Sequence, residues 1–409
     1  MKLLARLVRT SAATSLIVCG LLWGMIAGSY SSLAENYYVT QESGLSFSDY
    51  ITATASGSVP SSNIGGTKET ETELRLFGVF PIKTVTVSKI EIKKVVPGGI
   101  PFGIKMISDG VLVTSTGSVQ SEGKTVCPAK EAGIKASDVI VSINGKQMQS
   151  NQDVIKTVSK CAGETLRVVL RKSDGDMRQV DIKPVKDSSD NTYKIGIWVR
   201  DSSAGIGTVT FYDPESEVFA GLGHAVCDSS TGDILSLLEG EVVGAQIDGV
   251  TRGKAGAPGQ LNGHFATISD TGCILKNDET GVYGKLEQVK VTGEAVPVAL
   301  KQEVKTGKAT ILATLSGFTP QEYEIEIEKI SLNTERAIKN MVVRVTDERL
   351  LSQAGGIVQG MSGSPILQNG KLIGAVTHVF VNDPTRGYGI FAETMLKSSD
   401  SVKETLKAS

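Results

Sequence analysis

The sequence predicts a mainly β protein that begins with an export segment or membrane anchor and continues into two β domains. Glycine contributes 45 of the 409 residues while aromatic residues make up only 5%, which is typical of short strands joined by tight turns. Strand-like apolar runs recur along the chain, and helical periodicity in its last 200 residues is weak except around residues 392–396. At about 150 residues per domain, the length fits two or three domains.

The composition is that of ordinary globular domains. Hydrophobic residues make up 40% and charged residues 21%, and 42 Lys and Arg face 44 Asp and Glu, which gives a net charge of −2. These values exclude a long disordered tail, a collagen-like fibre and a protein with many membrane spans. Because no basic excess is available to neutralise phosphates, nucleic acid is not expected as the main partner.

Residues 1–34 predict a signal peptide or membrane anchor. Lys2, Arg6 and Arg9 precede an uncharged, mostly apolar stretch from residue 11 to residue 28. Small residues before position 35 permit cleavage there. A buried core helix is the alternative, but the positive charges flank only one side of the stretch. We therefore expect the body of the protein outside the cytoplasm, either anchored to a membrane or released.

Four of the five cysteines lie in the exported part, and none of them is spaced as Cys-x-x-Cys. This spacing argues against a zinc ribbon or a thioredoxin-type site, and we predict no metal and no cofactor. An exported chain permits disulfides, and two cysteines fall in each predicted domain. The hypothetical pairs are Cys127–Cys161 and Cys227–Cys273.

Residues 35–94 predict a loose stalk and a small β unit, and residues 95–185 carry a more specific order of elements. Strands are expected at 103–106 and 110–113, followed by a short helix that ends at Gly133. An alternating strand over 137–143 then runs into an Asn144-Gly145 turn. A helix over 151–160 and a strand over 166–170 complete the unit.

This order resembles a PDZ domain, and the run A-G-I-K-x-x-D-x-I-x-x-I-N-G over residues 132–145 is its most specific signal. The resemblance implies a domain that binds an extended peptide as an added strand. It assigns Pro101, Phe102, Gly103 and Ile104 to the apolar-Gly-apolar loop, whose N–H groups would meet a peptide carboxylate. The alternative is that these residues only pack a small β sandwich.

A polar linker over 183–192 leads into residues 193–409, whose β segments and Gly-rich turns suit a β-sandwich or a double β-barrel. The sharpest motif of this domain is Gly360-Met361-Ser362-Gly363-Ser364-Pro365. A nucleophilic serine needs a tight turn with N–H groups directed at the developing oxyanion, and glycines permit such a turn. The alternative is a plain Gly/Ser turn.

Histidine is the usual base for a serine hydroxyl, because its pKa lies near neutrality. The chain has three histidines: His224, upstream of the serine at a predicted strand end; His264, its competitor; and His378. A carboxylate must then fix the imidazole tautomer. Asp347 and Asp270 both lie between His224 and Ser362, and the spacing does not decide between them.

The motif Gly-x-Ser-Gly-x-Pro resembles that of chymotrypsin-like serine peptidases. Residues 195–202, 347–365 and 370–385 narrow this to a strong resemblance to the sporulation peptidase family SpoIVB, which extends over nearly the full chain. It implies a chymotrypsin-like double β-barrel after the PDZ domain, with a triad of His224, Asp347 and Ser362. It also implies that the N–H groups of Gly360 and Ser362 bind the oxyanion and that His378 walls the specificity pocket, where we expect it to favour a polar P1 residue.

The resemblance further implies an exported serine endopeptidase that cleaves itself and an inhibitory membrane protein. The cleavage would take place between the forespore and mother-cell membranes and would activate a sigma factor during sporulation. A PDZ scaffold with an inactive peptidase domain is one alternative. An HtrA-like envelope quality-control protease is another, although its PDZ domain follows the peptidase. A PDZ metalloprotease is excluded because His-Glu-x-x-His is missing.

Overall fold

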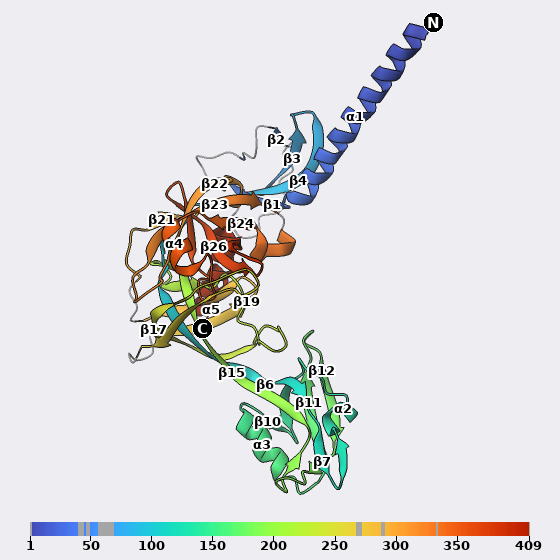
Figure 1. The fold of residues 1–409 in the computed structure, drawn as a ribbon, viewed down its shortest axis with the longest axis vertical. Helices are drawn as coiled ribbons and strands as arrows, with labels where there is room; N and C mark the ends of the chain where they lie inside the picture. Colours follow the sequence, from blue (N-terminus) through green and yellow to red (C-terminus); the bar gives the residue numbers. More distant parts are fainter. Residues whose placement is uncertain are drawn as a thin grey trace.

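The structure, a computed structural model, describes residues 2–39, 45, 50–55, 69–266, 272–287, 291–332 and 334–408. It is mainly β, as predicted. Figure 1 shows two barrels in the middle of the molecule, a small sheet beside an N-terminal helix at one end, and a smaller domain at the other end.

The N-terminal helix and a four-stranded sheet form the first unit. Helix α1 spans Lys2–Ser32, and the sheet has the order β1-β4-β3-β2. Its strands are β1 (Asn36–Val39), β2 (Ile51–Ala55), β3 (Glu69–Leu76) and β4 (Phe80–Lys89). Tyr37, Leu74 and Leu76 fill its small core. Among the helices that the structure describes, none is both long and apolar enough to cross a membrane, so the export segment stays a prediction.

The smaller domain confirms the predicted order of elements. Helix α2 (Pro128–Glu131) ends before Gly133, which has a φ of +76°, and helix α3 (Asn151–Ser159) begins after the cap Ser150. Asn144 and Gly145 both have positive φ in the turn between β9 and β10. Its strands are β7 (Val119–Ser121), β8 (Lys124–Val126), β9 (Val139–Ile143), β10 (Lys146–Gln147), β11 (Leu166–Arg171), β12 (Met177–Ile182), β13 (Val185–Lys186) and β14 (Tyr193–Lys194).

Six strands pair in a ring that forms the first barrel. The ring runs β6-β17-β19-β20-β16-β15 and closes where β15 pairs with β6. Phe102, Phe219, Val242 and Ile274 are among the apolar residues of its core. The strands are β6 (Pro101–Thr116), β15 (Ile197–Asp213), β16 (Val218–Gly221), β17 (Leu237–Thr251), β19 (Gly272–Asp278) and β20 (Gly281–Leu286); β5 (Lys94–Pro97), β18 (Gln260–Phe265) and β21 (Val296–Pro297) extend the sheet.

The second barrel is a closed ring of six strands in the order β22-β23-β24-β27-β26-β25. Its core includes Ile311, Met341, Val343 and Ile366, all fully buried. The strands are β22 (Gly307–Ala313), β23 (Gln321–Ile330), β24 (Met341–Val345), β25 (Pro365–Gln368), β26 (Lys371–Phe380) and β27 (Asp383–Phe391). The helices of this region are η1 (Lys301–Glu303), η2 (Thr334–Lys339), α4 (Glu348–Ala354) and α5 (Ala392–Ala408).

Strands β6 and β15 connect the first barrel to the smaller domain. They are 16 and 17 residues long and pair from Ile197↔Thr116 in the smaller domain to Thr208↔Pro101 in the barrel (Figure 1). The smaller domain is therefore inserted between two barrel strands. The two strands predicted at 103–106 and 110–113 are one strand, and its first half, which the sequence assigned to the PDZ segment, belongs to the barrel sheet.

Candidate active site

A cleft of about 550 Å³ between the two barrels holds the predicted base and nucleophile. The first barrel contributes Leu222 and His224, which follow β16, and the second contributes Gly360, Ser362 and His378. The structure therefore brings together residues that lie far apart in the sequence, and His378, the residue predicted to wall the specificity pocket, lines the same cleft.

The segment 359–363, here named the nucleophile turn, requires glycine at two positions. Gly360 and Gly363 have φ of +96° and +95°, which side chains other than glycine rarely adopt. A Cβ on Gly363 would lie 2.1 Å from the carbonyl oxygen of Thr208. The motif thus allows the turn to press against strand β15.

Every carbonyl of the nucleophile turn accepts a hydrogen bond from the protein. Two of these bonds come from Thr208, one from its hydroxyl and one from its N–H. The bonds are Leu261 N to Gln359 O (2.8 Å), Thr208 Oγ1 to Gly360 O (2.8 Å), Ser364 N to Met361 O (2.9 Å), Thr208 N to Ser362 O (3.2 Å) and Thr210 Oγ1 to Gly363 O (2.8 Å).

The N–H groups of the same turn are paired at only three positions. They belong to Gln359, Met361 and Gly363, which donate to the carbonyl oxygens of Gly259 (2.8 Å), Val358 (3.1 Å) and Val376 (2.8 Å). Within the described part of the chain, the N–H groups of Gly360 and Ser362 have no protein acceptor. These are the two groups that the sequence assigned to the oxyanion hole, and such donors beside a nucleophile can stabilise a tetrahedral oxyanion.

Both reactive side chains are hydrogen-bonded to backbone carbonyls. The Ser362 hydroxyl donates to Thr377 O over 2.6 Å, and His224 Nδ1 lies 2.8 Å from Ala225 O. A neutral imidazole that donates from Nδ1 carries its lone pair on Nε2, which is the tautomer a general base needs. Burial lowers the pKa of His224, while the bond to Ala225 opposes that shift. The ring is therefore neutral at pH 7.

The second histidine of the cleft packs against the first. The ring centroids of His224 and His378 are 4.7 Å apart, with an interplanar angle of 36°. Burial, with further contributions from His224 and Lys339, lowers the pKa of His378 to about 4. Both rings also line a second cavity of about 470 Å³, and Glu279 is the only carboxylate residue among those that line either cavity in the described structure.

Asp347 does not meet His224 in this structure. It is the N-cap of α4, and its carboxylate accepts from the N–H groups of Arg349 (2.9 Å), Leu350 (3.4 Å) and Glu324 (3.2 Å). The guanidinium of Arg349 lies 2.7 Å away and, as the largest cause, lowers the pKa of Asp347 to about 2. The carboxylate is fully engaged at the helix terminus, beyond the end of β24. Asp270, the other candidate, lies outside the described residues.

The competitor His264 is placed away from the cleft. It lies on β18, where its Nδ1 is 2.9 Å from Asp248 Oδ2, and its side chain is 58% exposed. The residues that line the cleft do not include it. His224 is thus the histidine that shares the cleft with Ser362 and also precedes it in the sequence.

Sequence reasoning missed the residues that hold the segment after His224. The amide of Asn277 accepts from Val226 N (2.8 Å) and donates to Val226 O (3.0 Å) and Leu235 O (2.9 Å). Asn277 is half-buried near the end of strand β19, and an Asn at a strand end was the available signal, because an amide removed from water needs hydrogen-bond partners.

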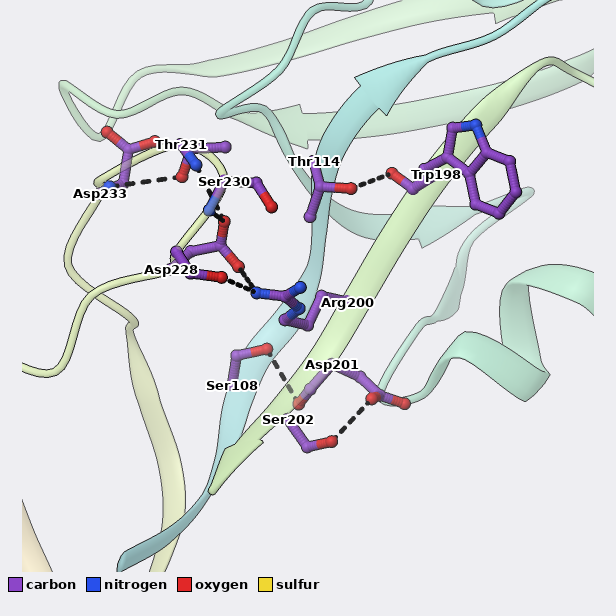
Figure 2. A network of polar contacts seen from close by, with 11 residues as sticks. Ser108, Thr114, Trp198, Arg200, Asp201, Ser202, Asp228, Ser230, Thr231 and Asp233 are labelled. Carbon is purple, nitrogen blue, oxygen red and sulfur yellow. Dashed lines mark hydrogen bonds and ion pairs between the residues drawn. The ribbon is translucent and has the colours of Figure 1, made fainter. Parts of the chain in front are cut away.

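A charged network fixes the next part of this segment (Figure 2). Arg200 on β15 pairs with the buried carboxylate of Asp228, which also accepts from the N–H groups of Ser230 (2.8 Å) and Thr231 (3.0 Å). Burial alone would raise the pKa of Asp228, but these N–H groups and Arg200 lower it on balance. The strand that leads from the smaller domain back into the first barrel is thus tied to the segment that carries His224.

The predicted peptide loop is not at a free sheet edge. Pro101, Phe102, Gly103 and Ile104 lie in β6, which pairs with β15 on one side and, from Phe102 onward, with β17 on the other. All four are buried. Strand addition needs a free edge, so this assignment is corrected: these residues pack the first barrel, which is the alternative reading of the same motif.

A groove in the smaller domain combines an apolar-Gly-apolar run with an open strand edge, which residues 101–104 do not have. It has a volume of about 580 Å³ and runs between α3, with Val154 and Ile155, and the start of β15. Ile195-Gly196-Ile197 supplies a second apolar-Gly-apolar run, with a φ of +75° at Gly196. Over residues 197–201 of β15, β6 is the only strand paired among the described residues. The outer edge is therefore open to an added strand.

The hypothetical disulfides are not formed. All five cysteines are free thiols, and Cys227 and Cys273 belong to different elements: the segment after His224 and strand β19. Across the described residues, no group of three or more His, Cys, Asp or Glu side chains could hold a metal ion.

Known proteins resemble separate parts of the chain. Serine protease HTRA1 of Xenopus tropicalis is 44% identical over 50 residues, which is 12% of this chain and 11% of that protein. A periplasmic serine endoprotease DegP-like protein of Bartonella henselae is 34% identical over 109 residues, 22% of each chain. The chain spans less than a third of the length of the curated relatives that it matches. Among solved structures, the Rv3671c protease in its inactive form is 13% identical over 48% of this chain and 84% of that chain, with a TM-score of 0.28.

Two protein families match successive parts of the chain. The PDZ domain family matches residues 98–183, and the family described as SpoIVB peptidase S55 matches residues 191–396. The second match contains His224, Ser362 and the complete second barrel. Because it spans half of the chain, the protein belongs to the SpoIVB peptidase S55 family and carries a PDZ domain besides its peptidase domain.

Proposed function

We propose that the protein is an exported serine endopeptidase in which Ser362 is the nucleophile, His224 the general base, and the N–H groups of Gly360 and Ser362 the oxyanion hole. One observation carries the proposal. The nucleophile turn leaves those two N–H groups unpaired beside the serine, in a cleft shared with a neutral histidine.

The proposed reaction is acyl transfer to Ser362. Its hydroxyl first leaves Thr377 O, to which it now donates, and a substrate N–H that takes this carbonyl would favour the release. The oxygen then attacks the peptide carbonyl carbon while its proton moves to Nε2 of His224. Each oxyanion donor contributes roughly 3 kcal/mol to the transition state. His224 returns the proton to the leaving amine. Water then attacks the acyl-enzyme ester and gives its proton to Nε2 of His224, which returns it to the Ser362 oxygen as the acid product leaves.

The group that orients the imidazole of His224 is the next feature of the proposed mechanism. In the present conformation, Ala225 O fixes the tautomer. Asp347 is the carboxylate that the family resemblance assigns to this role. To take it, Asp347 would have to leave the cap of α4 and the guanidinium of Arg349. We therefore assign Asp347 to the helix cap in this conformation, and its substitution tests the two roles.

Substrate selection is proposed to involve both domains. His378 lines the cleft as a ring kept neutral by burial, which suits a polar P1 side chain that needs a hydrogen-bond partner. The open edge of β15 beside α3 suits an extended peptide of a substrate or of the protein itself. The proposed substrates are the protein's own N-terminal region and an inhibitory membrane protein, and the proposed setting is sporulation between the forespore and mother-cell membranes.

Mass spectrometry of the new amino termini tests the function. Purified wild type and Ser362→Ala would be incubated alone, with casein, and with candidate membrane-protein ectodomains. Amino termini produced by wild type only would establish the activity, self-processing and the residues preferred at P1. Identical products from both proteins would instead indicate a peptide-binding scaffold. Ser362-dependent digestion of unfolded casein without selective cleavage would favour a quality-control protease.

A further inference from the structure

We propose that Thr208 is a positioning residue for catalysis, and this inference rests on the proposed function. Thr208 lies on β15 with 3% of its surface exposed, between the two segments that carry the reactive groups. It does not line the cleft and touches no reacting atom. Its effect is exerted through the nucleophile turn.

Three hydrogen bonds join Thr208 to both sides of the site. Its hydroxyl donates to Gly360 O (2.8 Å), and its N–H donates to Ser362 O (3.2 Å). Its own carbonyl accepts from Leu222 N (3.2 Å), two residues before His224. One residue thus holds the nucleophile turn and the base segment in register.

The hydroxyl acts where the turn is easiest to rearrange. A glycine without a Cβ permits more than one orientation of its peptide groups, so Gly360 needs restraint on both sides. Leu261 N holds the carbonyl of the preceding peptide group, and the Thr208 hydroxyl holds the carbonyl of the following one. All peptide bonds of the described residues are trans, so a fixed Gln359 carbonyl directs the Gly360 N–H the opposite way, free of protein acceptors.

Loss of the hydroxyl therefore affects the oxyanion hole more than ground-state binding. Without it, Gly360 O loses its partner, and the Gly360–Met361 peptide group keeps only the bond from Met361 N to Val358 O. This peptide group can then rotate, which shifts the turn between the two oxyanion donors and misaligns them. Transition-state stabilisation falls while contacts with the substrate side chains remain. The expected signature is a fall in kcat at nearly constant KM.

The test compares Thr208→Val, which is nearly isosteric, with Thr208→Ser, which keeps the hydroxyl. We expect Thr208→Val to lower kcat roughly 10- to 100-fold with KM within about twofold, as for a partly lost oxyanion donor. Binding of a peptide aldehyde, which forms an oxyanion mimic on the serine, should weaken by a similar factor, while product-peptide binding stays unchanged. Thr208→Ser should restore kcat to within about threefold of wild type.

Thr210→Val is the matched control, because Thr210 is also buried on β15 and donates its hydroxyl to the next carbonyl of the turn, Gly363 O. Equal kcat losses in the two Val variants, or failure of Thr208→Ser to restore kcat, would show a merely structural role and overturn the inference. If Thr208→Val does not fold, the pair Thr208→Ser and Thr208→Ala isolates the same hydroxyl. Equal cleavage by wild type and by Ser362→Ala would instead refute the proposed function itself.

Discussion

Replacing Asp347 separates a helix cap from a catalytic carboxylate. Asp347→Ala removes the side-chain oxygens that cap α4, whereas Asp347→Asn keeps one oxygen for the N–H groups of Arg349 and Leu350. Loss of an N-cap costs about 1 kcal/mol of stability. The ion pair to Arg349, whose side chain is 58% exposed, adds little to this because solvent screens it. For a domain of about 200 residues, Asp347→Ala should therefore lower Tm by roughly 2–8 °C.

The charge of Asp347 also sets the pH range of this stabilisation. The native pKa of about 2 lies below the ordinary 3.8, so the native state favours the carboxylate. Its contribution is complete above about pH 5 and is lost progressively as the pH falls through 3.8 toward 2. The stability difference between wild type and Asp347→Ala should therefore be constant near neutral pH and shrink in acid.

The assay measures Tm by thermal unfolding and kcat of Ser362-dependent cleavage on the same samples. If Asp347 only caps the helix, Asp347→Asn should have a Tm and a kcat close to those of wild type. An aspartate that orients the base of a serine triad behaves differently, because its replacement by asparagine lowers kcat roughly 10⁴-fold without unfolding the protein. A loss of that size in Asp347→Asn at unchanged Tm would refute the capping role and support the triad that the family resemblance implies.

Three further predictions address the turn, the base and the domain connection. Gly363→Ala should abolish peptide cleavage because its Cβ would lie 2.1 Å from Thr208 O. Gly370→Ala, also at positive φ but in open space, should remain active in the same assay. An active Gly363→Ala enzyme would contradict the predicted clash with Thr208. The pH profile of kcat/KM should rise through a pKa below 6.5, since burial favours neutral His224, and stay level at pH 7; an acid limb centred above 6.5 would argue against it as the base. Arg200→Gln leaves the buried Asp228 without its cation and should lower the free energy of unfolding, measured by chemical denaturation, by roughly 1.5–3 kcal/mol. Lys105 and Glu241 form an exposed pair, so Lys105→Gln should change this free energy by no more than about 0.5 kcal/mol. Equal losses in both variants would be inconsistent with a special role for the Arg200–Asp228 network.

Local sequence signals predicted the elements that depend on local backbone geometry. Gly133, Asn144 and Gly145 end a helix and form a turn through their own φ values, so the PDZ elements were predicted close to their observed bounds. The nucleophile turn was predicted for the same reason, because only glycines fit its φ values at positions 360 and 363. Residues within a few positions of each other determine such features.

The tertiary structure decided which distant strands pair. This pairing determines whether a given local motif is buried or accessible. The apolar-Gly-apolar pattern occurs at Phe102-Gly103-Ile104 and at Ile195-Gly196-Ile197; the pairing of β6 with β15 and β17 buries the first, while the second lies beside an open edge. In the same way, Asp347 has a sequence position that suits a triad, yet the start of α4 takes its carboxylate. A sequence motif specifies the chemistry that a residue can offer. Hydrogen bonds across the barrels determine which partner receives it, because most buried polar groups are satisfied by the neighbours that long-range pairing supplies.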